Sequence, residues 1–324
     1  MSLKAIALIS GGLDSALAAK VIMLQRIDVA GFAFTTPFTH PQVERLGQSL
    51  GIEVRAIDIS PEYLDVVKNP RFGFGNTMNP CIDCHIFMLK KARELADEYK
   101  AYFIITGEVL GQRPMSQNKS ALGKIEKESG LEGLLLRPLS ARLLAPTIPE
   151  QRGWVDRDKL FDFSGRSRKP QIELAKQLGL EGFGQPAGGC LLTDPGFSRR
   201  LKDLIAHQQD FNLSDVQLLK IGRHFRLSGR AKLILGRNRI ENQRLAPLVK
   251  SGDIHLEPVG SPGPAGILRS KDACPELLEL SAGILARYCD HNSEQVSVSI
   301  GDERESRVIR CFPAKPEDLD ALRI

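Results

Sequence analysis

Short apolar runs and segments of helical periodicity alternate along the first third of the chain. Four runs rich in aliphatic and β-branched residues predict strands, and the amphipathic segments between them predict helices. The predicted strands cover residues 4–9, 29–34, 53–59 and 102–106, and the predicted helices cover residues 15–25, 42–50 and 86–99. Strands that alternate with helices form parallel sheets covered on both faces. The pattern therefore predicts an α/β fold built on a doubly wound parallel sheet.

The pattern changes further along the chain. Residues 69–79 and 136–170 are rich in Gly, Asn, Pro or Arg and lack clear periodicity, which is typical of long functional loops. Helical periodicity returns at residues 171–178 and in a polar segment at 198–209. Short strands and turns prevail from residue 216, and one helix is expected at 277–288. This change predicts a second, smaller α+β domain.

These transitions set the expected domain boundaries. We expect a first domain at residues 1–195, a linker helix at 196–215 and a second domain at 216–324. The length of 324 residues supports this division, because it exceeds what one compact core usually organises.

Composition narrows the class of protein. The chain is 42% hydrophobic and 26% charged, which is ordinary for a globular protein. No signal peptide is expected, and no apolar run approaches the roughly 20 residues that a spanning helix needs. We therefore expect a cytoplasmic protein without a membrane partner. Six cysteines in such a chain indicate thiol chemistry or metal binding rather than a disulfide framework.

The hexapeptide between the first predicted strand and helix carries the strongest chemical signal. Two adjacent glycines let the backbone approach phosphate oxygens, and the positive end of a helix attracts an anion. The flanking hydroxyls supply further donors, and the carboxylate suits a magnesium ion or a helix cap. The residues are Ser10, Gly11, Gly12, Leu13, Asp14 and Ser15. The absence of a following Gly-Lys-Ser/Thr argues against a Walker loop.

Three cysteines form the second candidate site. Cys81 and Cys84 stand at the mouth of a predicted helix, whose positive end is expected to lower their thiol pKa. Cys190 follows a glycine-rich turn that leaves its sulfur accessible. A single Cys-x-x-Cys is by itself ambiguous among a redox pair, a metal half-site and chance. The remaining cysteines, Cys274, Cys289 and Cys311, have no paired spacing and are expected to be packing residues.

These motifs resemble those of a known family. The phosphate loop resembles the PP-loop of ATP pyrophosphatases, and residues 4–195 look like the catalytic domain of tRNA thiouridine synthases of the ThiI-like and MnmA-like branches. The segments that carry the resemblance are Thr106 to Gln112, Ser116-Gln117, Leu136 to Leu139, Asn79 to Cys84 and Gly188 to Cys190.

The resemblance implies a set of nucleotide-binding residues. ATP and Mg²⁺ are the implied cofactors, with Ser10, Gly11, Gly12, Asp14 and Ser15 holding the nucleotide. Gly107 and Gln112 border the same pocket. Asp14 also counts among the implied catalytic residues, with Cys84 and Cys190.

For sulfur transfer the resemblance leaves two routes. In a persulfide route Cys190 carries the sulfur and Cys84 releases it by forming a disulfide. In an iron–sulfur route Cys81, Cys84 and Cys190 hold three irons of a cluster and leave the fourth iron open for sulfide. The additional Cys81 favours the cluster slightly. A cysteine desulfurase or sulfide is the implied sulfur donor.

Basic residues suggest where RNA would bind. Between Lys220 and Lys250 there are nine Lys or Arg residues and one acid, Glu241, a density that suits a phosphate backbone or a solvated face. Residues 216–300 resemble an NFACT-type RNA-binding domain, and His224 and Phe225 offer rings for stacking. The basic residues of the first domain that suit tRNA phosphates, or an ordinary solvated loop, are Arg137, Arg142, Arg166, Arg168 and Lys169.

The combined prediction is an ATP-dependent tRNA sulfurtransferase that adenylates a uridine carbonyl and inserts sulfur, giving 4-thiouridine or 2-thiouridine. One alternative is a PP-loop enzyme that acts on another substrate. A second, from a different class, is a non-catalytic RNA-binding or ribosome-associated factor that keeps an ATP-binding fold.

Overall fold

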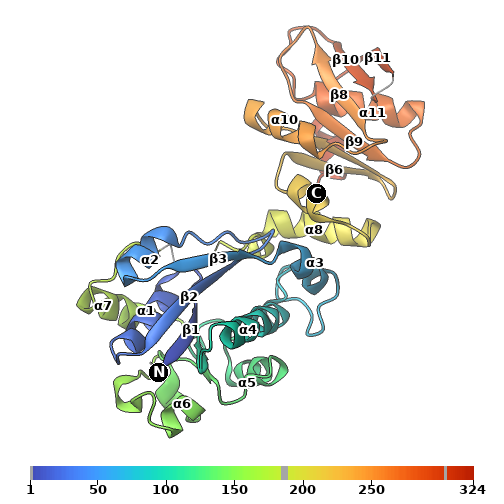
Figure 1. The fold of residues 1–324 in the computed structure, drawn as a ribbon. Helices are drawn as coiled ribbons and strands as arrows, with labels where there is room; N and C mark the ends of the chain where they lie inside the picture. The colour runs from blue at the N-terminus through green and yellow to red at the C-terminus, as the bar shows by residue number, and fades with distance from the viewer. Residues whose placement is uncertain (1–2, 184–188, 303–304) are drawn as a thin grey trace. The chain divides into compact units, whose positions relative to one another are not determined.

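The computed structural model describes residues 3–183, 189–302 and 305–324, and it divides into two compact units, Met1–Thr193 and Asp194–Ile324 (Figure 1). Unit 1 contains a five-stranded sheet in the order β3-β2-β1-β4-β5, and all of its strand pairs are parallel. The strands are β1 (Lys4–Leu8), β2 (Asp28–Thr35), β3 (Val54–Asp58), β4 (Phe103–Ile105) and β5 (Leu135–Leu136). The predicted doubly wound α/β fold is confirmed.

Helices cover both faces of this sheet. On one face α1 (Leu13–Met23) packs against α2 (Glu44–Leu50) and α7 (Lys169–Gln177). On the other face α4 (Cys81–Glu98) packs against α3 (Ser60–Lys68) and α5 (Lys119–Glu128). Helix α1 is buried almost all round, because Leu13, Leu17 and Ile22 are at most 1% exposed and its alanines fill the space against the sheet.

The order of strands determines where a ligand site can form. Strand order reverses at β1, so the loops that follow β1 and β4 diverge from the carboxyl end of two neighbouring strands. In parallel α/β sheets this point is where ligands usually bind. The loop after β1 contains residues 9–12, and the loop after β4 contains residues 106–118.

The long segment 136–170 is more ordered than its composition predicts. It contains the 3-10 turns η1 (Ala141–Leu143) and η2 (Arg157–Lys159) and the short helix α6 (Ile148–Gln151). Two backbone hydrogen bonds close it on itself, from Phe161 N to Pro138 O at 2.9 Å and from Phe163 N to Leu139 O at 2.8 Å. The segment delivers Arg168 to the start of α7. The 3-10 turn η3 (Leu191–Thr193) ends the unit.

Unit 2 contains a six-stranded antiparallel sheet in the order β11-β10-β8-β9-β7-β6. The strands are β6 (Arg223–Ser228), β7 (Ala231–Leu235), β8 (Ile254–Val259), β9 (Gly266–Ser270), β10 (Val296–Gly301) and β11 (Ser306–Cys311). The helices are α8 (Pro195–His207), α9 (Leu213–Leu219), α10 (Arg239–Leu245), α11 (Pro275–Ala286) and α12 (Pro316–Asp320), and η4 (Ala246–Leu248) follows α10. Helix α11 packs on β8, β10 and β11 and buries its run from Ser281 to Ala286. The second, smaller α+β domain is confirmed.

Helices α8 and α9 cover the range that the sequence assigned to a linker. Phe197 and Leu201 of α8 are at most 1% exposed, and Asp203 on the same helix forms ion pairs with Arg226 and Lys232 of the sheet. Both helices are therefore part of compact unit 2. Among the residues described, no helix combines the length and the apolar character needed to cross a bilayer.

Candidate active site and RNA-binding surface

The loop after β1 wraps tightly at the N-terminus of α1. Gly11 has a φ of +78°, which favours glycine, and a Cβ there would approach Gln42 O to 3.1 Å. Ser15 Oγ donates to Gly12 O at 2.9 Å and accepts a hydrogen bond from Ser10 N at 3.2 Å. Gly12 caps α1 without a side-chain hydrogen bond. The helix therefore presents backbone N–H groups that suit an anion, as the sequence predicted.

The loop after β4 lies directly on this turn. A Cβ on Gly107 would come within 2.4 Å of Asp14 C and Ser15 N, so only glycine fits at this contact. Gln112 Nε2, further along the same loop, donates to Asp14 Oδ2 at 2.8 Å. The structure thus brings together the residues that the resemblance assigned to one nucleotide pocket.

Two residues from the start of α7 complete the surroundings of Asp14. Arg168 forms an ion pair with Asp14 at 3.7 Å, and Gln171 Nε2 donates to Gln112 Oε1 at 3.0 Å. Gln171 is fully buried. From the sequence, Arg168 was predicted only as one of several basic loop residues. Gln171 was not predicted as a site residue, because a buried glutamine in an amphipathic helix has no distinctive pattern. Asp14 is not the N-terminal cap of α1, a role that belongs to Gly12.

The three candidate cysteines lie close enough together that the charge of one thiolate affects the pKa of another. Cys81 is the first residue of α4, Cys84 stands one turn later and Cys190 precedes η3. The pKa of Cys84 is raised to about 12, chiefly by burial and also by the neighbouring Cys190 and Cys81, while a hydrogen bond with Tyr63 opposes the rise. Burial also raises the pKa of Cys190, and Cys81 adds to that rise. The expected lowering of the Cys84 pKa at the helix N-terminus is wrong, because burial outweighs the helix end.

Segments that follow β2 and β3 hold the cysteines. After β2, the carbonyl of Phe38 accepts a hydrogen bond from Leu191 N at 3.0 Å, next to Cys190. After β3, Tyr63 of α3 contacts Cys84 and is 2% exposed. Thr77 Oγ1 donates to Leu192 O at 2.8 Å and ties the cysteine loop to the same turn. The predicted turn residues Pro186, Ala187 and Gly188 lie outside the described residues.

Cysteine thiolates are the donors that iron–sulfur clusters require, so the residue types fit such a group. Partly buried thiols whose ionised forms repel one another also gain from a cationic partner, which stabilises the thiolates. Across residues 3–183, 189–302 and 305–324, however, no three His, Cys, Asp or Glu side chains converge as a metal site. The donor types therefore fit, and the arrangement in the structure is not that of a closed metal centre.

A buried charged network links the loops after β4 and β5 to α4 and α5. Glu108 accepts hydrogen bonds from Arg137 Nε at 2.8 Å and Thr106 Oγ1 at 3.0 Å, and His85 Nδ1 lies 2.7 Å from its other oxygen. Burial raises the pKa of Glu108, but the Arg137 charge and the His85 contact outweigh it and lower that pKa to about 2. Arg137 also pairs with Glu126 at 2.9 Å and is 3% exposed. It is therefore a structural residue, and the expected tRNA contact or solvated position is wrong for Arg137.

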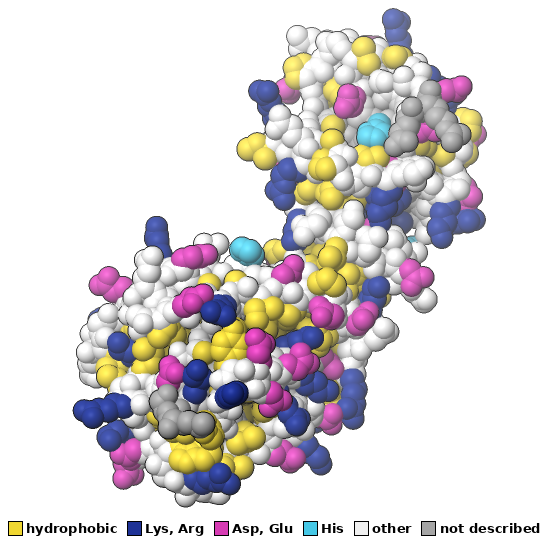
Figure 2. All heavy atoms as spheres, in the orientation of Figure 1, with side chains coloured by type: hydrophobic (Ala, Val, Ile, Leu, Met, Phe, Trp, Pro, Cys, Tyr) yellow, Lys and Arg dark blue, Asp and Glu magenta, His cyan; other side chains and the backbone are white. Residues whose placement is uncertain are grey.

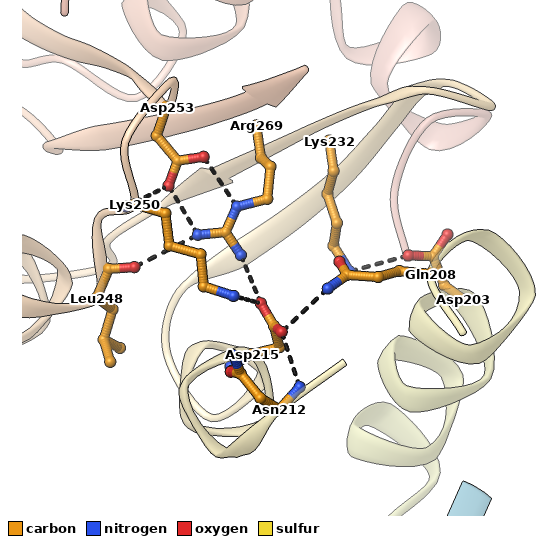
Figure 3. Close-up of polar contacts among 9 residues, drawn as sticks. All are labelled: Asp203, Gln208, Asn212, Asp215, Lys232, Leu248, Lys250, Asp253 and Arg269. Carbon is orange, nitrogen blue, oxygen red and sulfur yellow. Dashed lines mark hydrogen bonds and ion pairs between the residues drawn. The ribbon is translucent and has the colours of Figure 1, made fainter. Parts of the chain in front are cut away.

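In unit 2 much of the predicted basic surface is neutralised internally. Asp203 pairs with Arg226 at 2.7 Å and Lys232 at 2.9 Å, and Glu241 pairs with Arg237 at 2.6 Å. Figure 3 shows a second cluster, in which Arg269 lies between two carboxylates and Lys250 joins one of them. Its ion pairs are Arg269 to Asp253 at 2.7 Å, Arg269 to Asp215 at 2.8 Å and Lys250 to Asp215 at 2.5 Å.

The rings expected to stack on bases are also inside the unit. His224 is 1% exposed and Phe225 is 0% exposed, so neither reaches solvent. Burial lowers the pKa of His224 well below its ordinary value, and the Lys232 charge adds to this effect. Of the cysteines assigned to packing, Cys289 is buried, Cys311 is partly buried and Cys274 is exposed, so that assignment is wrong for Cys274.

Exposed cations remain on the surface of unit 2. Arg239 and Arg244 project from α10, and Arg230 lies in the turn between β6 and β7, where it pairs with the exposed Asp272. In Figure 2 Lys and Arg side chains are spread over the visible face of this unit among acidic ones. Phosphate contacts are therefore expected from these outer arginines rather than from the buried ones.

The architecture is a doubly wound parallel α/β unit followed by an antiparallel α+β unit, and two family models match the chain in that order. Residues 1–142 match the model described as thiamine biosynthesis protein (ThiI), and residues 222–323 match the NFACT protein RNA binding domain. The chain thus matches the ThiI model in its first unit and the NFACT RNA-binding model in its second. No curated protein matches the chain.

Among solved structures, the chain is similar to a 4-thiouridine synthetase in complex with RNA and bound ATP. The identity is 22%, the TM-score is 0.41, and the match covers 67% of this chain and 52% of that chain. The C-terminal part of a fibronectin/fibrinogen-binding protein from Streptococcus suis gives 11% identity and a TM-score of 0.29, over 75% and 94% of the two chains. NMN synthetase from Francisella tularensis is 14% identical with a TM-score of 0.35, and the match covers 67% of this chain and 83% of that chain.

Proposed function

We propose that this protein is an ATP-dependent tRNA sulfurtransferase that adenylates a uridine carbonyl and replaces its oxygen with sulfur. One observation carries the proposal. The phosphate loop after β1 and the surroundings of Cys81, Cys84 and Cys190 are built at the carboxyl end of one sheet, and the loop after β4 touches both. Gly107 and Gln112 of that loop contact the Asp14 turn, while the charge of Arg113 acts on Cys190. The family-model matches support tRNA as the substrate class.

The first chemical step is adenylation. The carbonyl oxygen of uridine attacks the α-phosphorus of ATP, the bond between the α-phosphorus and the bridging oxygen breaks, and pyrophosphate leaves. Backbone N–H groups of the phosphate loop would hold the phosphates, and Mg²⁺ would neutralise their charge when bound, with Asp14 as its carboxylate partner. The oxygen of the base is then part of AMP, which is a good leaving group.

The second step is sulfur transfer. The terminal sulfur of a Cys190 persulfide attacks the activated carbon, and AMP leaves. The thiolate of Cys84 then attacks the Cys190 sulfur, the persulfide S–S bond breaks, and sulfur stays on the base while a Cys84–Cys190 disulfide forms. The two electrons that reduce the transferred sulfur come from this pair, so an external dithiol must reduce the disulfide before the next turnover. A cysteine desulfurase, which carries sulfur as a persulfide, can recharge the reduced Cys190. Sulfide can recharge Cys190 only by attacking the Cys84–Cys190 disulfide itself, which forms the Cys190 persulfide, releases the Cys84 thiol and takes the place of reduction by a dithiol.

An iron–sulfur route uses the same residues differently. Cys81, Cys84 and Cys190 would hold the cluster, which when bound would supply an open iron for incoming sulfide. The raised pKa values of free Cys84 and Cys190 suit this alternative, since a cation bound to the three sulfurs would stabilise their thiolates.

The test combines nucleoside analysis with cysteine variants. Protein purified without oxygen is incubated with ATP, unmodified tRNA and either sulfide or a cysteine desulfurase with cysteine, and tRNA nucleosides are measured by mass spectrometry. Thiouridine should form with the wild type and with Cys274→Ala, and it should be lost in Cys190→Ala although ATP still binds. Absence of thiouridine with both donors, or full activity of Cys190→Ala, would overturn the proposal.

Iron and acid-labile sulfide assays on the same preparations separate the two routes. Iron that disappears in Cys81→Ala together with activity supports the cluster. Active, iron-free protein whose Cys81→Ala variant keeps its activity supports the persulfide pair. Binding of ATP and RNA without any change in the nucleosides would instead indicate the non-catalytic RNA-binding alternative.

A further inference from the structure

Asp14 and three polar side chains from two other segments form a network of hydrogen bonds and an ion pair. Gln112 from the loop after β4 donates to Asp14 Oδ2 at 2.8 Å, and Gln171 from α7 donates to Gln112 at 3.0 Å. Arg168, the residue that precedes α7, reaches the same Asp14 oxygen at 3.7 Å. This network connects α7 to the phosphate loop, although more than 150 residues separate the two in the sequence.

Several polar atoms of this network lack a hydrogen-bond partner among the described residues. In the part of the molecule that the structure describes, Asp14 Oδ1, Arg168 Nε and Gln171 Oε1 are all buried and have no hydrogen-bond partner. Buried polar atoms nearly always find partners, and three such atoms in one small region indicate that a group is missing from the network. Gln171 is 0% exposed, so its unpaired oxygen is enclosed by the protein and has no access to bulk solvent.

The charges identify the missing group as an anion beside a cation. Asp14 stands in the turn whose backbone N–H groups suit a phosphate, and its carboxylate repels one unless a positive group compensates. Arg168 is placed to do so. Its separation of 3.7 Å from Asp14 is an ion pair rather than a close hydrogen bond, so the guanidinium is not committed to the carboxylate. A guanidinium offers paired donors that match phosphate oxygens.

We propose that Arg168 binds a phosphate group of the nucleotide and that Gln171 positions Gln112 for the same nucleotide. Without nucleotide Arg168 pairs with Asp14, and with nucleotide it moves to the phosphate and leaves the Asp14 carboxylate free to face the phosphates' counterion. Helix α7 is thereby a third wall of the pocket, beside the loops after β1 and β4. This inference rests on the proposed nucleotide site and adds residues that lie beyond the 1–142 range of the ThiI family match.

The experiment measures nucleotide binding by calorimetry in the absence of RNA and sulfur donor. Arg168→Met should weaken ATP binding by at least about tenfold, the usual loss for a charged hydrogen bond, and leave the weak binding of adenosine unchanged. Arg168→Lys keeps the positive charge but loses the paired donors of the guanidinium. Its ATP affinity should therefore fall between those of the wild type and Arg168→Met. Gln171→Leu should also weaken ATP binding, because Gln112 loses its donor.

Lys176→Met is the matched control, since Lys176 is exposed at the last turn of the same helix and its loss removes the same charge. It should bind ATP like the wild type, and melting curves should show that all variants are folded. Wild-type ATP affinity in a folded Arg168→Met protein would overturn the inference while leaving the proposed function standing. Failure of the wild type itself to bind ATP would overturn both.

Discussion

Gly107 lies directly against the backbone of Asp14, 93 residues earlier in the chain, so closely that a methyl group would stand 2.4 Å from the Asp14 carbonyl carbon. This contact fits the loop after β4 to the loop after β1 at the point where strand order reverses. Side-chain hydrogen bonds adjust the pocket, but this backbone contact determines how closely the two loops approach.

Gly107→Ala is therefore expected to displace the phosphate loop. The added methyl group must push backbone, not a flexible side chain, so the variant should lose about 1–3 kcal/mol of stability. It should also lose most of its ATP affinity. Chemical denaturation and calorimetry check the two effects. Gly123→Ala is the control, because a Cβ at Gly123 meets nothing within 4 Å and an alanine within α5 should stabilise by up to about 1 kcal/mol. Unchanged ATP binding in Gly107→Ala would show that the two loops do not form one pocket.

Glu108→Gln is expected to destabilise unit 1 by about 3–5 kcal/mol at neutral pH, because it removes the more buried of the two carboxylates that pair with the buried Arg137. The pKa of Glu108 in the folded protein, about 2, lies below its ordinary 4.5. Its contribution is therefore present above pH 4.5 and is lost as the pH falls toward 2.

The difference in free energy of unfolding between wild type and Glu108→Gln should accordingly shrink between pH 5 and pH 3, as measured by urea denaturation. The exposed Glu132 supplies a comparison, since Glu132→Gln should change stability by less than about 0.5 kcal/mol. A difference for Glu108→Gln that is constant with pH would mean that Glu108 is not ionised in the folded protein.

The thiols are expected to differ sharply in reactivity. With its pKa raised to about 12, Cys84 is almost entirely protonated at pH 8, and Cys190 is shifted in the same direction. Iodoacetamide should therefore modify Cys84 at least about tenfold more slowly than the exposed Cys274, and the rate should rise with pH. Peptide mass spectrometry of timed samples measures both rates. Rapid modification of Cys84 at pH 7 would show that its thiol is activated even without substrate.

Arginines of unit 2 should separate into two groups by their effect on RNA binding. Arg239→Gln and Arg244→Gln remove exposed charges on α10 and are expected to weaken RNA binding without loss of stability. Each lost phosphate contact should lower the slope of log affinity against log salt by about 0.7–0.9. Titrations at several salt concentrations measure this slope. If neither variant changes affinity or slope, RNA binds elsewhere on the protein.

Arg269→Met should have the opposite profile. It removes the partner of Asp215 and Asp253, which are 1% and 4% exposed in their side chains, so unit 2 should lose about 3–5 kcal/mol of stability. Thermal melting measures this loss. The exposed pair of Arg230 and Asp272 provides the comparison, because breaking it should cost less than about 1 kcal/mol. Equal losses for the two variants would mean that the Arg269 cluster is not buried in solution.

The sequence by itself determined the architecture, because alternating hydrophobic periods and glycine turns are local signals. Seven of the predicted elements of the first domain correspond to β1, α1, β2, α2, β3, α4 and β4, and the phosphate loop and the loop after β4 are recognisable as motifs. What became of each polar side chain was decided only by tertiary structure. Arg137 and His224 are buried, the pKa of Cys84 is raised, and four charges of the basic segment are paired internally. Gln171 joins the Asp14 network through contacts between distant segments. Periodicity reports which face of an element is apolar, whereas burial and charge pairing depend on neighbours that only the packed chain supplies.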